Sequence, residues 1–79
     1  MERNLSNVNW SLVQSFLAVA ETGSLSHAAT ALKLSQPTLG RHIRTLEDTL
    51  GVALFERHRR GLRLTATGAL IRPAAEDMR

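Results

Sequence analysis

The sequence predicts a mainly α-helical fold with a three-helix core, a two-stranded hairpin and a C-terminal helix. Two observations lead to this prediction. Apolar residues recur at the three- and four-residue spacing of amphipathic helices in four successive stretches of the chain. Between the third and the fourth stretch, residues 54–64 (LFERHRRGLRL) read as two short strands around a glycine, which is typical of a hairpin.

Length and composition exclude several classes of protein. A chain of 79 residues can bury one modest core but not an enclosed active site as well, so we expect no enzyme. The chain has no cysteine, which excludes disulfides and thiolate metal sites and suits the cytoplasm. The three histidines lack the close pairing of a zinc site, so we expect no metal. No apolar run is long enough for a membrane span, and the N-terminus lacks a signal-peptide core.

The positive charge is concentrated in the second half of the chain. Between Lys33 and Arg63 there are seven basic and three acidic residues, although the net charge of the whole chain is only +3. Nine of the ten cations are arginine, the better residue for bidentate contacts with phosphate or guanine. This charge distribution favours a polyanionic partner.

The first predicted helix follows a polar stretch, residues 1–8, which we expect to be a flexible tail. Asn9 can cap a helix that runs to about Thr22, and Gly23 is the expected C-terminal stop. We interpret Trp10, at the edge of the apolar face, as core or subunit packing rather than as a base-stacking platform. The predicted apolar face consists of Leu12, Val13, Phe16, Leu17, Val19 and Ala20, with Ser11, Gln14, Ser15 and Glu21 outside.

A second, shorter helix is predicted with Ser26 as its cap and the small residues Ala28 and Ala29 on its inner face. Lys33 then falls in a turn where the backbone often needs a positive φ. Its amino group would lie beside the N-terminus of the next helix, where a phosphate could bind. A merely solvated lysine remains an equal alternative.

The third predicted helix, residues 35–50, organises the rest of the chain. Ser35 can cap it, and Pro37 fits the first turn, where its missing N–H is not needed. The inward stripe consists of Leu39, Ile43, Leu46 and Leu50, and the outward stripe of Pro37, Arg41, Arg44 and Thr45. The outward stripe is therefore basic at its N-terminal half.

Residues 25–44 together have the pattern of a helix-turn-helix. The small alanines allow the two helices to approach closely, and Leu34 can fill the corner between them. In a helix-turn-helix the second helix can enter a DNA major groove. An ordinary pair of antiparallel helices with solvated arginines is the alternative that these residues leave open.

The hairpin is predicted from strands at about residues 54–56 and 62–64, with Gly61 in the turn. A basic hairpin that directly follows a helix-turn-helix is a wing. Arg57, Arg59 and Arg60 are expected at its tip, where they could reach phosphates or a narrow minor groove. A charged hairpin that serves only solubility is the alternative.

Thr65 can cap the last predicted helix, and Pro73 is expected to kink or loosen it. An apolar stripe along this helix is longer than the small core requires, which indicates a partner subunit, a further domain or both. With Trp10, the residues that we expect at a dimer interface are Leu70, Ile71, Ala74, Ala75 and Met78.

The complete order of motifs closely resembles the N-terminal DNA-binding domain of LysR-type transcriptional regulators over about residues 8–79. The motifs that carry the resemblance are FLAVAETGSLSHAA, LSQPTLGRHIRTLE, LGVALFER and GLRLTATG. The resemblance implies a winged helix-turn-helix at residues 9–64, followed by a linker helix, here residues 65–79, through which two chains dimerise. It also implies a further, C-terminal domain that binds a small-molecule effector, whereas no cofactor is expected in this domain.

By the same resemblance, the residues that read the DNA groove would be Ser35, Gln36, Pro37, Thr38 and Arg41. Gln36 could read an adenine edge, Pro37 or Thr38 could pack on a thymine methyl, and Arg41 could reach guanine or phosphate.

The wider contacts with DNA follow from the resemblance in the same way. Arg44 would lie beside the backbone, and the wing arginine of the family falls on Arg57.

Gly40 stands where similar proteins usually carry a small hydroxyl residue, and it weakens the helix by about 1 kcal/mol relative to alanine. His42 stands where glutamine is common, and we expect its ring toward the flank of the groove face, touching phosphate only.

The resemblance therefore implies a bacterial LysR-type regulator that binds double-stranded DNA as a homodimer, or as a tetramer at full length, on a dyad-symmetric operator. Helix 35–50 would enter the major groove and wing 54–64 the adjacent minor groove. A protein-docking module is the rival from another class. We interpret Glu47 and Asp48 as surface acids whose negative charge offsets that of nearby arginines, not as a catalytic pair.

Overall fold

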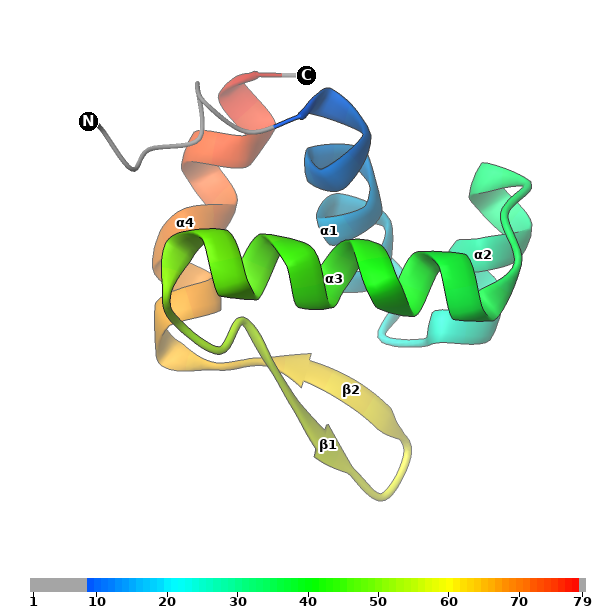
Figure 1. Ribbon diagram of the computed structural model, residues 1–79. Helices are drawn as coiled ribbons and strands as arrows, with labels where there is room; N and C mark the ends of the chain where they lie inside the picture. The colour runs from blue at the N-terminus through cyan, green and yellow to red at the C-terminus, as the bar shows by residue number, and fades with distance from the viewer. Residues whose placement is uncertain (1–8, 79) are drawn as a thin grey trace.

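The computed structural model describes residues 9–78, so the predicted tail at residues 1–8 and Arg79 lie outside the described residues. Four helices surround one core, and a two-stranded hairpin projects from them below α3 (Figure 1). The predicted fold class is confirmed. The elements in order are α1 (Trp10–Thr22), α2 (Leu25–Leu32), α3 (Gln36–Leu50), β1 (Phe55–His58), β2 (Gly61–Leu64) and α4 (Ala66–Asp77).

Helix α1 begins and ends as the sequence predicts. The Asn9 side chain accepts a hydrogen bond from Ser11 N at 2.7 Å, and Gly23 closes the helix at φ 69°. The expectation that Ser15 lies outside is wrong, because its side chain is fully buried against α3. A short hydroxyl can enter a core when a partner satisfies its hydrogen bond, and His42 does so here.

Helix α2 begins two residues earlier than predicted. Its cap is Ser24, which has an extended backbone and accepts a hydrogen bond from His27 N at 3.1 Å. Ser26 is inside the helix, and therefore cannot have the non-helical backbone of a cap. The predicted positive φ at Lys33 is confirmed at 59°.

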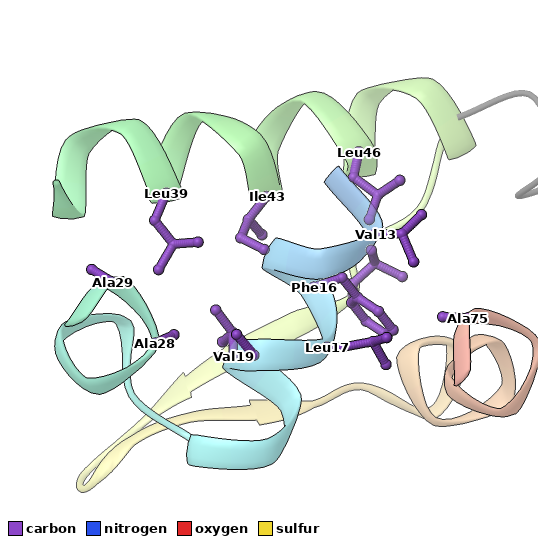
Figure 2. Close-up of a cluster of buried hydrophobic side chains, with 12 residues drawn as sticks. Val13, Phe16, Leu17, Val19, Ala28, Ala29, Leu39, Ile43, Leu46 and Ala75 are labelled. Atoms are coloured by element: carbon purple, nitrogen blue, oxygen red, sulfur yellow. The ribbon is translucent and has the colours of Figure 1, made fainter. Parts of the chain in front are cut away.

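The core lies between α1 and the inward faces of the other helices. Figure 2 shows Leu39, Ile43 and Leu46 of α3 pointing toward α1, with small side chains of α2 and α4 on either side. Phe16 of α1 also packs against the ring of Phe55, with 5.5 Å between the ring centroids. The buried apolar side chains are Val13, Phe16, Leu17, Ala18, Val19, Ala28, Ala29, Leu39, Ile43, Leu46, Leu54 and Ala75. The outward basic stripe of α3 is thus fixed by burial of the opposite stripe.

The hairpin pairs β1 with β2 in antiparallel register, with Phe55 opposite Leu64 and Arg57 opposite Leu62. Both strands are slightly displaced from the predicted ranges. Leu54 is fully buried and belongs to the core rather than to the ladder. Arg57, expected at the tip, lies within β1, and the turn is formed by residues 59–60.

Helix α4 is anchored at its first turn by Thr65. The Thr65 hydroxyl donates to Ala53 O at 2.7 Å and accepts from Gly68 N at 3.0 Å. The helix remains continuous through Pro73, so the proline does not end it. Ala75, expected at a dimer interface, is only 1% exposed and packs in the core of its own chain, which leaves it no surface for a partner.

Candidate nucleic-acid interface

The N-terminal turn of α3 carries a chain of hydrogen bonds on its outer surface. Ser35 Oγ accepts from Thr38 N at 3.2 Å, which caps the helix, and it donates to Thr38 Oγ1 at 2.9 Å. Arg41 Nη2 donates to the same Thr38 hydroxyl at 3.2 Å. The Arg41 guanidinium is therefore held along the helix and presented outward. Within residues 9–78 its other N–H groups make no hydrogen bond, so they can make bidentate contacts.

The structure places the sequence-predicted residues of α3 on one exposed face. Gln36, Pro37, Arg41 and Arg44 are exposed, and Thr38 is half-buried. Lys33 is exposed in the turn that precedes α3. Figure 2 shows the buried stripe of α3 pointing toward α1, so the exposed residues of α3 lie on the opposite side of the helix, away from the core. The prediction that this stripe of α3 faces outward is confirmed.

A cleft of about 320 Å³ separates α3 from the wing. Arg44 and Gly40 line it from α3, and Arg57 lines it from β1. The structure thus brings together two arginines that are thirteen positions apart in the sequence. Two guanidinium groups on opposite sides of a cleft can bind one polyanionic backbone between them.

The wing tip carries Arg59 and Arg60, both exposed in the turn. The turn is supported by His58, whose Nδ1 accepts from Arg60 N at 3.3 Å. Arg63 differs from the other arginines of the wing because it pairs with Glu56 across the ladder at 3.1 Å. Arg57, Arg59 and Arg60 therefore provide the positive charge of the wing that this acid does not neutralise.

Glu47 has a role that sequence reasoning missed. Its carboxylate oxygen accepts hydrogen bonds from Leu54 N at 2.8 Å and from Phe55 N at 3.3 Å. The acid on α3 therefore holds the start of the wing. A sequence signal was available, because Glu47 borders the inward stripe at Leu46, where a purely solvated acid is not expected.

Replacing Glu47 by alanine is expected to loosen the wing and to lower the free energy of unfolding by about 2 kcal/mol, because two amides lose a charged acceptor. Chemical denaturation measures this change. Glu47→Gln is the matched control, since its amide oxygen can still accept from both amides, and we expect it to retain most of the stability. Equal losses in the two variants would contradict this role.

His42 and Ser15 form a further contact that the sequence did not predict. His42 Nδ1 and Ser15 Oγ are 2.8 Å apart and join the middle of α3 to the middle of α1. The ring is half-buried, so it does lie on the flank of the outward face, but one of its nitrogens is directed inward.

Within residues 9–78, no group of three or more acidic, histidine or cysteine side chains could hold a metal ion. Over the same residues, no helix is both long and apolar enough to cross a bilayer.

The family model for bacterial regulatory helix-turn-helix proteins of the LysR family matches residues 10–69, which covers α1, the helix-turn-helix, the wing and the start of α4. The chain belongs to the LysR family. Its helix-turn-helix is α2 and α3, and its wing is β1 and β2.

Curated LysR-family relatives share much of this sequence. The chain is 55% identical over 53 residues to the HTH-type transcriptional regulator ClcR of Pseudomonas putida, a match that covers 67% of the chain and 18% of ClcR. It is 45% identical over 67 residues to HdfR of Escherichia coli, covering 85% of the chain and 24% of HdfR. The chain thus spans about a fifth to a quarter of the length of these regulators.

Solved structures of the LysR family have the same fold. The DNA-binding domain of CbnR, solved as a complex with DNA, superposes with a TM-score of 0.86 at 39% identity, covering 90% of this chain and 82% of that one. DarR of Vibrio fischeri, also solved in complex with DNA, gives a TM-score of 0.86 at 36% identity, covering 91% of this chain and 25% of DarR.

Proposed function

We propose that this LysR-family domain binds double-stranded DNA sequence-specifically, with α3 in the major groove and the wing on the adjacent minor groove. The observation that carries the proposal is the outward face of α3. Arg41 and Arg44 are exposed on it, and burial of the opposite stripe fixes their direction. The similar domain of CbnR and the regulator DarR were both solved with DNA, which supports the proposal.

The side chains divide into two groups by the contact that each would make. Ser35, Gln36, Pro37, Thr38 and Arg41 would meet base edges, and Lys33, Arg44, Arg57, Arg59 and Arg60 would meet the backbone or the minor groove. Phosphate contacts supply most of the affinity but carry no sequence information, whereas base contacts decide the sequence. We therefore assign sequence choice to the first turns of α3.

Two copies of the domain would bind a dyad-symmetric operator, joined through α4. Leu70 supports this because it is 79% exposed, an unusual exposure for a large apolar side chain on a helix. Met78 and Trp10 are also exposed, at 36% and 39%. Ala74 is exposed and Ile71 half-buried on the same helix. The whole protein would add a domain that senses a small-molecule effector, and it would act in the cytoplasm as a dimer or tetramer.

Selection of bound duplexes from a random pool, with the purified 79-residue chain, tests the function. We expect enrichment of a palindromic sequence whose half-sites are separated by about one helical turn of DNA, because a two-fold symmetric dimer presents two α3 helices to one face of the duplex. Recovery of unenriched random sequence, or no recovery of duplex at low salt, would contradict the proposal.

Replacing Leu70 by lysine is expected to weaken dimerisation by at least about 100-fold, because a two-fold interface loses the burial of two leucines. Sedimentation equilibrium on the selected duplex measures whether one or two chains bind. Ala69→Lys is the control on the same turn of α4, outside the predicted stripe. A two-chain complex that survives Leu70→Lys unchanged would show that α4 does not join the subunits.

A further inference from the structure

Helix α3 has two flanks, and only one of them faces the wing. Gly40 lines the cleft toward β1, and two residues further, after about 200° of helix rotation, His42 lies on the opposite flank. An α-helix with its side chains is about 10–12 Å wide and the major groove is about 12 Å wide. Both flanks of α3 would therefore lie beside a sugar-phosphate backbone.

On the flank away from the wing, His42 is held in a defined orientation. Its Nδ1 lies 2.8 Å from Ser15 Oγ, and Ser15 is fully buried in the centre of α1. The ring of a half-buried histidine with one nitrogen fixed in this way has little rotational freedom, and its other nitrogen, Nε2, points away from the fixed contact.

Nε2 reaches the surface. No side-chain nitrogen or oxygen of the described residues is both buried and without a hydrogen-bond partner, and the hydrogen bond of the His42 ring is made by Nδ1. Nε2 is therefore not buried, and His42 lines a cleft of about 130 Å³. The other residues that line this cleft are Ser11, Gln14, Ser15, Leu32 and Leu34.

The contact with Ser15 allows Nε2 to be a donor. A serine hydroxyl rotates freely, so Ser15 can donate to Nδ1, and a neutral imidazole then carries its proton on Nε2. A protonated imidazole donates from both nitrogens, and Ser15 Oγ can then accept. In either state the ring can present an N–H group at the surface of the cleft, which is the group that a phosphate oxygen accepts.

We propose that His42 is a DNA phosphate-binding residue, with Nε2–H donating to a backbone oxygen on the side of the groove opposite the wing. Ser15 acts as the positioning residue, from inside the core. The inference rests on the proposed DNA-binding function and deepens it: Arg44 and Arg57 would grip one backbone, and His42 the other.

The test uses the 79-residue chain and the duplex most enriched in the selection, with single phosphates replaced in turn by neutral methylphosphonate. For the native chain, we expect one replacement on the strand that borders the His42 flank to weaken binding about tenfold. His42→Phe keeps a ring but no nitrogen, and His42→Ala removes the ring. In both variants, the same replacement should weaken binding less than about twofold.

Two further variants separate phosphate binding from a purely structural role. His42→Gln carries an amide that can both bond Ser15 and donate to phosphate, so the sensitivity to that one methylphosphonate should return. Ser15→Ala should weaken binding to the unmodified duplex, and should have no further effect when combined with His42→Phe. Thermal unfolding of each variant shows whether the fold is retained.

If His42→Phe and His42→Ala are as sensitive as the native chain at every phosphate, the inference is wrong while the DNA-binding function stands. If the native chain binds no duplex, the proposed function and this inference are both wrong.

Discussion

Replacing Gly68 by alanine is expected to lower the free energy of unfolding by about 2 to 3 kcal/mol, which for a domain of this size lowers the melting temperature by about 10–20 °C. A Cβ atom at this position would lie 2.3 Å from Leu54 O and 2.9 Å from Leu64 Cδ2. The first of these atoms is backbone, and it accepts a hydrogen bond from Thr65 N at 3.0 Å. The backbone therefore cannot move without breaking the joint between the wing and α4.

Gly40→Ala is the matched control, because Gly40 is also helical but has nothing within 4 Å of the position of a Cβ atom. Alanine should stabilise α3 by about 1 kcal/mol there, since it removes the entropic cost of glycine. Calorimetry of the two variants should show melting temperatures that shift in opposite directions. A destabilised Gly40→Ala, or an unchanged Gly68→Ala, would contradict this account of the packing.

Replacing Arg41 by alanine is expected to reduce the preference for the selected duplex over random DNA by about 1 to 3 kcal/mol, which is roughly 5- to 150-fold. The guanidinium is exposed and held by Thr38 in the first turns of α3, where base edges are expected. Titrations of both duplexes at several salt concentrations measure the effect. Binding to random DNA should change much less.

Arg60→Ala is the comparison within the wing. Arg60 is exposed in the hairpin turn and would meet the backbone or the minor groove rather than base edges in the major groove. Its loss should weaken binding to both duplexes alike and should reduce the slope of log affinity against log salt by about 1, because one fewer counterion is released. Equal losses of specificity in Arg41→Ala and Arg60→Ala would contradict the proposed division between base and backbone contacts.

The local features of this fold could be predicted from the sequence. The caps at Asn9, Ser35 and Thr65, and the positive φ of Lys33, depend on residues within a few positions, whose preferences are direct consequences of backbone geometry. The inward stripe of α3 was predictable for the same reason, because its period is that of the helix itself.

The features that could not be predicted depend on contacts between distant residues. Ser15 was expected outside because a hydroxyl is usually exposed, but a partner 27 positions away satisfies it in the core. The position of Glu47 beside the inward stripe indicates partial burial, but nothing in the sequence of α3 identifies its partners, the amides of Leu54 and Phe55. In both cases a polar side chain makes a tertiary contact that periodicity does not encode.

Residues 53–55 connect α3, the wing and α4 through hydrogen bonds. The short segment between α3 and β1 is bonded to Glu47 on one side and to Thr65 on the other, and it leads directly into the wing. Neither helix can tilt or twist relative to the hairpin without straining bonds to this single joint. Torque applied along α4 would therefore turn α3 and the wing together, and the width of duplex that the two can straddle would stay the same.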